Sequence, residues 1–240
     1  MLERMKMTPS NWQYKEMQQV GVNYSNFEEV ARYDARMQKL RDIKSEIYKL
    51  VAITSPTAES TVLEIGIGTG EFAIAVSQLA KKVVAVDVST AMLDYAKEKA
   101  VEKNVHNIEF HHAGFLTFND SPEQFDIIFT QLALHHLPDF WKFIALKKIN
   151  TLLKKSGKFF VKDVVYPSNI KDYDAFFAEI IKAVKDSGAA EFIEEYIVHI
   201  RDEFSTLDWI MEDLLTRSGF SILKTDIENN VIYNYLCEKA

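Results

Sequence analysis

The feature that most constrains the fold is an alternation of short apolar runs with segments patterned as helices. The apolar runs are rich in Val, Ile and Phe and lie at 61–65, 82–87, 107–110, 125–130 and 158–165. Stretches with the three-and-four apolar spacing of helices separate most of them. This alternation predicts βαβ units, with right-handed crossovers that place helices on both faces of a mainly parallel sheet.

The rhythm changes after residue 165. Residues 171–203 are rich in Phe, Tyr, Ile and Glu and predict one or two helices, with a break near Ser187 and Gly188. A further amphipathic helix is expected over 206–218. Two apolar runs then follow, joined by a short Asn-containing link, and they predict an antiparallel strand pair. The expected fold class is therefore α/β, a doubly wound, mostly parallel seven-stranded sheet with an antiparallel last strand.

The length of 240 residues suits a single domain over 1–240. An apolar stripe predicts one helix from Asp34 to about Ile53. Within the domain we expect four parts: a covering segment at 1–33, a cofactor-binding core at 34–165, a helical lid at 171–203 and a closing helix and strand pair at 204–240.

Composition excludes several classes of protein. The net charge is −7, so there is no basic field to attract nucleic acid. A single cysteine, Cys237, cannot build a disulfide scaffold and is typical of a reducing compartment. The start of the chain lacks the apolar core of an export signal, and no run of about 18 apolar residues occurs. We expect a cytoplasmic protein that binds neither membrane nor nucleic acid.

A glycine-rich loop indicates where a ligand binds. Gly66-Ile-Gly-Thr-Gly70 lies between the first apolar run and a helical segment. Glycine permits a tight turn and lets a ligand approach the backbone. In open α/β sheets ligands bind beyond the carboxyl ends of the strands, where the strand order reverses. The loop predicts a nucleotide-type site there.

Acidic residues around the loop narrow the choice of cofactor. Asp87 ends the second strand 21 positions after Gly66, where a carboxylate can accept hydrogen bonds from both ribose hydroxyls. A dinucleotide-binding loop typically has the pattern G-x-G-x-x-G, but here the third glycine is one position early and Glu71 follows it. Glu64 and Glu71 would repel a pyrophosphate. S-adenosylmethionine, with a sulfonium and an α-ammonium that Glu64 can bind, suits the place better.

These motifs resemble those of a known family. Val62-Leu-Glu-Ile-Gly-Ile-Gly-Thr-Gly70, Val86-Asp-Val-Ser89, Phe125-Asp-Ile-Ile128 and Leu132-Ala-Leu-His-His-Leu-Pro-Asp139 are similar to the ordered motifs of class I S-adenosylmethionine-dependent methyltransferases, most of all those acting on small molecules. The resemblance covers about residues 30–165. It also implies an antiparallel last strand beside strand five.

The resemblance implies roles for individual residues. Gly66 and Gly68 would line the methionine part of the cofactor, and Asp87 would hold the ribose. The remaining contacts would come from Val88 and Met92 on the adenine, Gln131 and Leu132 on the methionine portion, and Tyr33, which touches the cofactor in relatives. Gly114 stands where many members have an acid for the adenine amino group, so the backbone of Gly114 and Phe115 would read that edge instead.

Two adjacent histidines raise the question of a metal or a base. Neighbours in an extended chain point to opposite sides, so His135 and His136 make a poor pair of ligands and no metal site is predicted. His136 is a candidate active-site wall or general base.

The expected reaction is an in-line displacement. A nucleophilic atom of a small-molecule acceptor attacks the sulfonium methyl, and the protein aligns the partners and excludes water. A non-catalytic S-adenosylmethionine-binding protein remains an alternative, because binding motifs survive loss of chemistry. An NAD-linked oxidoreductase is a second alternative, which the early third glycine and the antiparallel end strand disfavour.

Overall fold

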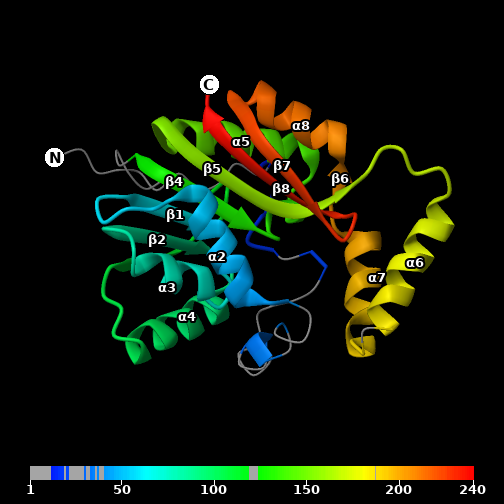
Figure 1. Cartoon of the computed structure of the whole chain (residues 1–240), viewed down its shortest axis with the longest axis horizontal. Coiled ribbons are helices and arrows are strands. Elements are labelled where there is room, and N and C mark those ends of the chain that lie inside the picture. Colours follow the sequence, from blue (N-terminus) through cyan, green and yellow to red (C-terminus); the bar gives the residue numbers. More distant parts are fainter. Residues whose placement is uncertain are drawn as a thin grey trace.

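The structure is a computed structural model, and it describes residues 12–18, 20–21, 30, 33–35, 37, 41–118, 124–186 and 188–240. Its strands are β1 Thr61–Ile65, β2 Lys82–Asp87, β3 Ile108–His112, β4 Phe125–Gln131, β5 Leu153–Tyr166, β6 Thr206–Leu207, β7 Phe220–Glu228 and β8 Ile232–Lys239. Its helices are α2 Ile43–Thr54, α3 Glu71–Ser77, α4 Thr90–Glu102, α5 Asp139–Leu152, α6 Tyr173–Asp186, α7 Ile193–Asp202 and α8 Asp208–Arg217. Figure 1 shows their arrangement.

The strands form one mixed sheet in the order β3-β2-β1-β4-β5-β8-β7. β1 to β5 run parallel to one another, and β8 runs antiparallel to both β5 and β7. The doubly wound, mostly parallel sheet with an antiparallel last strand is thus confirmed. The two-residue strand β6 pairs with β5 outside this order and makes an eighth strand beyond the seven expected.

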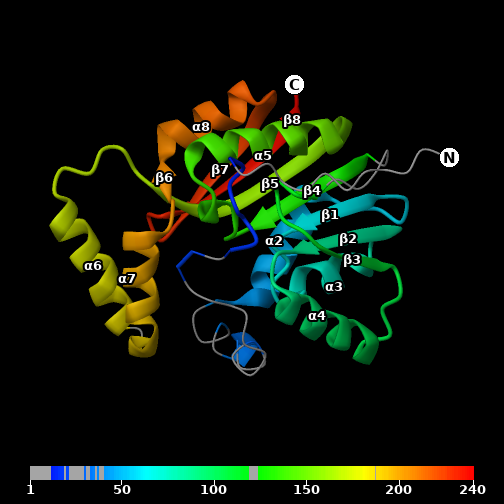
Figure 2. The same ribbon diagram turned by 180° about the vertical axis from the view of Figure 1, so that it is seen from behind.

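Helices cover both faces of the sheet. α2, α3 and α4 lie on one face, and α5 and α8 lie on the other, which Figure 2 shows from behind. Successive strand residues point to opposite faces, so Val62 packs with Leu50 and Phe72 on the α2–α4 side. Leu63 packs with Leu146 on the α5 side. Both faces of β1 are therefore buried, as its predominantly apolar residues predict.

Several element boundaries differ from those expected. The helix predicted from Asp34 to Ile53 was wrong as a single element, because Asp42 caps a new start by accepting a hydrogen bond from Ser45 N–H. The helix after Pro138 ends at Leu152, and β5 begins directly at Leu153, which pairs with Phe125.

The predicted start of the last helix also shifts. Thr206 and Leu207 pair with the end of β5, and α8 begins only at Asp208, because pairing with the sheet competes with the first helical turn. The third strand begins one residue later than expected and runs on to His112.

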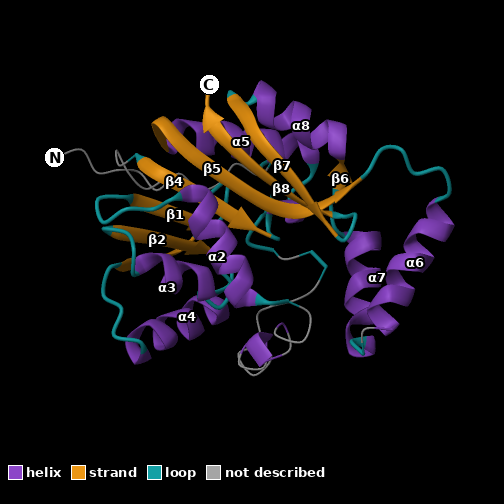
Figure 3. Cartoon of the chain, in the orientation of Figure 1, coloured by secondary structure: helices purple, strands orange, loops and turns teal. Residues whose placement is uncertain are grey.

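The residues after β5 form a helical arm. α6 and α7 are joined through a 3-10 turn at Ala190–Phe192, which confirms two helices with a break between them. Figure 3 shows the pair set beside the carboxyl ends of the strands and linked to the sheet by loops. Its own small core consists of Val184, Ala189 and Phe192. Among the described residues, no helix combines the length and apolarity needed to cross a bilayer.

Candidate functional site

The glycine loop leaves β1 where the sheet reverses direction, because the chain runs from β1 outward through β2 to β3 and then returns to β4. Gly66, Gly68 and Gly70 all have positive φ. A Cβ on Gly66 would lie 2.5 Å from the Cβ of Ala133, and one on Gly70 would lie 2.9 Å from that of Ala96. A Cβ on Gly68 would meet nothing within 4 Å. Gly66 and Gly70 are therefore needed for packing, whereas Gly68 borders open space that a ligand can fill.

Asp87 closes this loop onto the second strand. Its carboxylate accepts hydrogen bonds from Gly68 N–H at 2.9 Å and Ser89 N–H at 2.8 Å. Burial raises the pKa of Asp87 to about 6. A carboxylate has about four acceptor positions, so capacity remains for hydroxyl donors from a ligand.

Glu64 is a buried carboxyl next to the loop, with only 2% of its surface exposed. It accepts a hydrogen bond from Ala73 N–H in the first turn of α3, a helix whose N-cap Gly70 supplies no side chain. Its Oε2 atom is buried and has no partner. Burial, and secondarily the charge of Asp87, raise the pKa of Glu64 well above its usual value. An orphaned buried carboxyl oxygen fits a cationic ligand such as the α-ammonium of S-adenosylmethionine.

Glu71 does not face a ligand, contrary to the argument from the sequence. Lys99 Nζ lies 2.6 Å from Glu71 Oε1 and 2.6 Å from Asp34 Oδ2. Thr69 Oγ1 donates to the other oxygen of Asp34 at 2.5 Å. The Lys99 ammonium forms ion pairs with both carboxylates, so Glu71 links α3 to α4 and Asp34 links the N-terminal segment to the loop.

The expected adenine side contains an acid that the sequence argument missed. Val88 Cγ1 would lie 2.8 Å from a Cβ on Gly114, so these two residues border the same space. The Glu16 carboxyl carbon would lie 2.7 Å from that Cβ. Glu16 accepts hydrogen bonds from Leu116 N–H at 2.9 Å and Thr117 N–H at 2.6 Å. A carboxylate from the N-terminal segment thus stands beside the glycine that replaces the expected acid.

The other sequence-predicted residues are distributed around this edge. The side chains of Met92 and Phe115 are buried in the core, so Phe115 offers its backbone alone. Burial raises the pKa of Tyr33, and Asp87 is among the charges that act on it. Leu132 has a φ of 52°, and its N–H donates to Lys162 O.

Gln131 turns to the opposite side from the one expected. It lines a small cavity with Glu46 and Leu50 of α2 and with Lys162, so its side chain lies on the α2 face of the sheet. Only its backbone remains at the expected methionine end.

A polar cluster follows β4 where the acceptor is expected. Leu134–His136 form a 3-10 turn, not an extended chain, so the adjacent imidazoles lie side by side with ring centroids 4.4 Å apart. His135 Nδ1 lies 2.5 Å from Asp163 Oδ1, and its Nε2 lies 3.3 Å from Glu203 Oε2. The assumption that the two side chains diverge was wrong.

The pKa values of the two histidines shift in opposite directions. Burial lowers the pKa of His135, but Asp163 and Glu203 outweigh it and the net shift is upward. Burial, and secondarily the charge of His135, lower the pKa of His136 to about 4. His136 Nδ1 is buried and unpartnered. His199 Nδ1–H donates to the Glu203 carboxylate, and His199 Nε2 lies 2.9 Å from Ser205 Oγ.

Two segments hold this turn from outside. Tyr14 OH donates to His136 O at 3.1 Å, and Phe204 N–H donates to His135 O at 2.9 Å. The cluster is therefore covered by the N-terminal segment and by the chain leaving α7. Sequence inspection could not find Glu16, Asp163 or Glu203 as site residues, since each reaches the site through a contact with a distant part of the chain.

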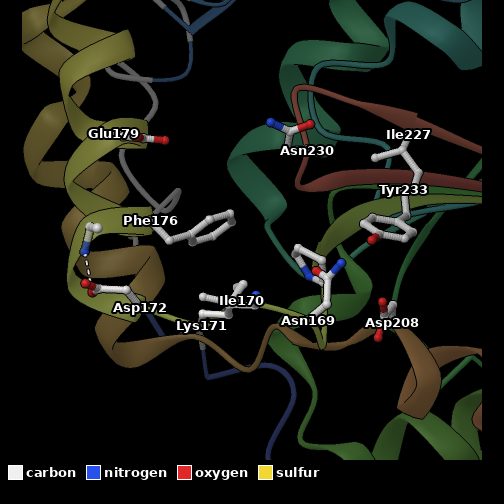
Figure 4. A pocket seen from close by; sticks show the side chains of 12 residues that line it. Asn169, Ile170, Lys171, Asp172, Phe176, Glu179, Asp208, Ile227, Asn230 and Tyr233 are labelled. Carbon is white, nitrogen blue, oxygen red and sulfur yellow. Dashed lines mark hydrogen bonds between the residues drawn. The ribbon is translucent and has the colours of Figure 1, made fainter.

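A separate cavity of about 660 Å³ lies between the arm and the β7–β8 turn. Phe176 of α6 and Tyr233 of β8 enter it from opposite sides (Figure 4). No sequence-predicted site residue lines it, so it is distinct from the site at the carboxyl ends of the strands.

Comparisons with known proteins identify the family. A sequence profile described as "Methyltransferase domain" matches residues 62–157. An uncharacterized methyltransferase of Bacillus licheniformis is 32% identical over 67% of this chain and 70% of its own length. One of Anoxybacillus flavithermus is 28% identical over 81% of this chain and 85% of its own length.

A solved structure shares the fold. An S-adenosylmethionine-dependent methyltransferase from Clostridium acetobutylicum superposes with a TM-score of 0.65 at 14% identity, covering 89% of this chain and 98% of that one. Together with the profile and the sequence relatives, this agrees with the motifs around the glycine loop. The chain belongs to the methyltransferase family.

Proposed function

We propose that this enzyme transfers the methyl group of S-adenosylmethionine to a small-molecule acceptor. The cofactor lies across Gly66–Gly68, with its ribose on Asp87 and its α-ammonium on Glu64. Val88 and Met92 border the adenine, and the backbone of Gly114 and Phe115 reads its edge. Tyr33 and Leu132 close over the reacting end.

The observation that carries the proposal is the orphaned oxygen of Glu64. A carboxyl buried without a second partner costs folding free energy, and a cation at that place recovers it. NAD would present a pyrophosphate to this loop and has no ammonium group to place on the Glu64 oxygen. The ammonium of S-adenosylmethionine supplies the missing charge.

The bound cofactor supplies an activated methyl group on a positive sulfur. Held by Glu64 and Asp87, the cofactor would donate that methyl to an acceptor atom and leave as a neutral thioether. The chain's own part is to align the two molecules and exclude water. The cover made by Tyr14 and Phe204 over the His135–His136 turn supports such an enclosed site.

His136 does not suit the role of general base. Efficient general bases have a pKa near the operating pH. The pKa of His136 is about 4, so its imidazole would hold an abstracted proton only weakly at neutral pH. Its neutral, unpartnered Nδ1 is suited to bind or orient a group at the acceptor end. We therefore assign His136 a positioning role.

A small acceptor is supported by charge and by enclosure. The net charge of −7 disfavours a nucleic acid. The acceptor end is overlaid by the N-terminal segment and by the chain leaving α7, which leaves little room for a macromolecular surface.

Calorimetry with S-adenosylhomocysteine and a labelled-methyl assay test the proposal. We expect the wild-type protein to bind S-adenosylhomocysteine and Glu64→Gln to bind it about 10- to 100-fold more weakly, since a hydrogen bond to a charged group contributes about 1.5–3 kcal/mol. The exposed substitution Glu59→Gln should change nothing.

The assay then distinguishes the acceptor classes. Label from S-adenosylmethionine should pass into a low-molecular-weight metabolite fraction. Label found only in macromolecules would overturn the small-molecule acceptor. Retention without transfer to any fraction would mark a non-catalytic binding protein, and absence of binding would overturn the whole proposal.

A further inference from the structure

We infer that His135, His136 and Glu203 form a binding site for a divalent transition-metal cation at the acceptor end of the active site. One ligand atom from each residue, an imidazole nitrogen or a carboxylate oxygen, lies within 4.8 Å of the others. Two imidazoles and one carboxylate are a donor set that zinc and related cations accept.

The spacing of the donors fits such an ion. His135 Nε2 and Glu203 Oε2 lie 3.3 Å apart. With metal–nitrogen bonds of 2.0–2.1 Å, ligand atoms around a tetrahedral zinc ion are separated by about 3.4 Å. A direct charge-assisted hydrogen bond would bring the two atoms to about 2.7–2.9 Å. The observed separation therefore matches two ligands of one ion better than a hydrogen-bonded pair.

The hydrogen bond on the far side of His135 leads to the same conclusion. Its Nδ1 faces Asp163 at 2.5 Å, so in the neutral tautomer the proton lies there and Nε2 carries a lone pair. That nitrogen points at a carboxylate oxygen, so a proton lies between the two atoms in the metal-free protein, and a divalent cation displaces that proton when it binds. A metal-bound histidine usually donates its other N–H to a carboxylate, as His135 does here.

The third donor is otherwise unexplained. His136 Nδ1 is buried and has no hydrogen-bond partner. Its ring lies 4.4 Å from that of His135, centroid to centroid, on the same 3-10 turn. A buried imidazole nitrogen without a partner is costly, and coordination to a cation satisfies it.

The surrounding groups complete the arrangement. His199 contacts the Glu203 carboxylate from the neighbouring turn of α7 and is itself held by Ser205. Asp163 and Glu203 bring two negative charges, which balance a divalent cation bound by neutral imidazoles. Asp163 and His199 thus act as positioning residues for the ligands.

The site lies next to the transferred methyl group if the proposed function holds. Ala133, two residues before His135, would touch a Cβ on Gly66 of the cofactor loop. Three protein ligands leave a coordination position open. An acceptor that carries a hydroxyl, enolate or carboxylate oxygen could occupy it, so the ion would select oxygen-bearing acceptors and favour their ionised form.

Metal titration of the full-length protein tests the inference without relying on activity. After treatment with a chelator, Zn²⁺ is titrated by calorimetry, and Co²⁺ is added to a second sample to record visible d–d absorption. We expect one Zn²⁺ per chain and a Co²⁺ spectrum typical of nitrogen and oxygen ligands. No heat and no Co²⁺ absorption would overturn the inference.

Variants locate the site. His136→Gln should weaken Zn²⁺ binding at least about tenfold and change the Co²⁺ spectrum, and His199→Gln should weaken it about 10- to 100-fold through Glu203. The exposed His106→Gln removes an imidazole elsewhere and should match wild type. Equal affinity in wild type and His136→Gln would overturn the site. If His136→Gln fails to fold, as judged by circular dichroism, Glu203→Gln takes its place with the same criterion.

The same samples separate this inference from the proposed function. S-adenosylhomocysteine is titrated into the chelator-treated protein. Zn²⁺ binding without S-adenosylhomocysteine binding would refute the proposed function and leave the metal site intact. The reverse result would refute the metal site alone.

Discussion

The buried carboxyl of Glu64 lowers the stability of the ligand-free protein at neutral pH, although it is proposed to bind the cofactor. Burial raises its pKa well above normal, so in the folded protein it holds a proton that the unfolded chain releases. The resulting stability is fully present below the unfolded pKa, about 4.3, and is lost as pH rises through the folded pKa. We expect Glu64→Gln to raise the melting temperature of the ligand-free protein at pH 7.5, measured by differential scanning fluorimetry. An unchanged or lower melting temperature, with Glu59→Gln as reference, would contradict this.

Asp87 should make cofactor binding depend on pH. Its pKa of about 6 lies above the ordinary 3.8, and the protonated carboxyl has one acceptor oxygen fewer for the ribose. Affinity for S-adenosylhomocysteine should therefore fall as pH drops below about 6 and be about tenfold weaker at pH 5 than at pH 7.5. Calorimetry across this range measures it. Asp87→Asn should bind weakly at both pH values, and a variant that kept the wild-type pH profile would assign the titration to another group.

At the scale of elements, different glycines of the loop serve packing and cofactor binding. Gly66→Ala would force its methyl against Ala133 at a positive φ, and we expect it to destabilise the fold by at least about 2 kcal/mol. Gly68→Ala meets no neighbour and should cost only the strain of about 1–2 kcal/mol, yet weaken S-adenosylhomocysteine binding. Urea denaturation and calorimetry give the two quantities.

Gly188→Ala is the matched control for Gly68→Ala. It has φ of +81° and open space around it, but lies in the arm between α6 and α7. It should show a similar loss of stability with no change in binding. If both variants bound normally, the space beside Gly68 would not be the cofactor's.

The N-terminal segment contributes to stability through Glu16. Glu16→Ala leaves the N–H groups of Leu116 and Thr117 without their partner and should destabilise the protein by about 2 kcal/mol. Its exposed neighbour offers the control Lys15→Ala, which should have no measurable effect. Equal urea midpoints for the two variants would mean that the hydrogen bonds of Glu16 to Leu116 and Thr117 do not stabilise the fold.

How much of this could be predicted from sequence depends on the range of the interaction. β1 and β2 are bounded by local signals, an apolar run ending in glycine or in Asp87, and both ranges were correct. The start of the fifth strand was not, because it lies at Leu153, ahead of the apolar run at 158–165, where pairing with a distant strand overrides local preference. Likewise a 3-10 turn at His135 depends on the Asp163 contact and has no local signature.

At the scale of the whole molecule, the arm forms a small core of its own. Phe192 is 1% exposed and packs with Val184 and Ala189, away from the two clusters that flank the sheet. Phe192→Ala should remove about 3 kcal/mol of local stability. Hydrogen exchange should then show loss of amide protection in α6 and α7 and normal protection in β1 and β4.

A core residue of the sheet provides the contrast. Phe129→Ala, in β4, removes a side chain of equal burial from the cluster beneath α2 and α3, so protection should fall throughout the sheet. Uniform loss of protection in Phe192→Ala as well would show that the arm and the sheet unfold together.

The long-range parts of the site belong to this largest scale. Glu16 meets the loop after β3 across 100 residues, and Glu203 meets His135 although 203 − 135 = 68 positions separate them. Such meetings are decided by tertiary packing, which no local pattern records. The cofactor loop could be predicted because its residues follow adjacent strands directly, whereas the acceptor end could not.

The placement of His199 and Glu203 on the α6–α7 arm has a consequence for how such enzymes diversify. The residues proposed to hold the cofactor precede residue 136, whereas these two arrive on an insertion after β5 that has its own core. A genetic crossover that replaces only this insertion would change the acceptor-binding residues and leave the cofactor-binding residues unchanged. The choice of acceptor and the methyl-transfer reaction can thus evolve in separate segments of one gene.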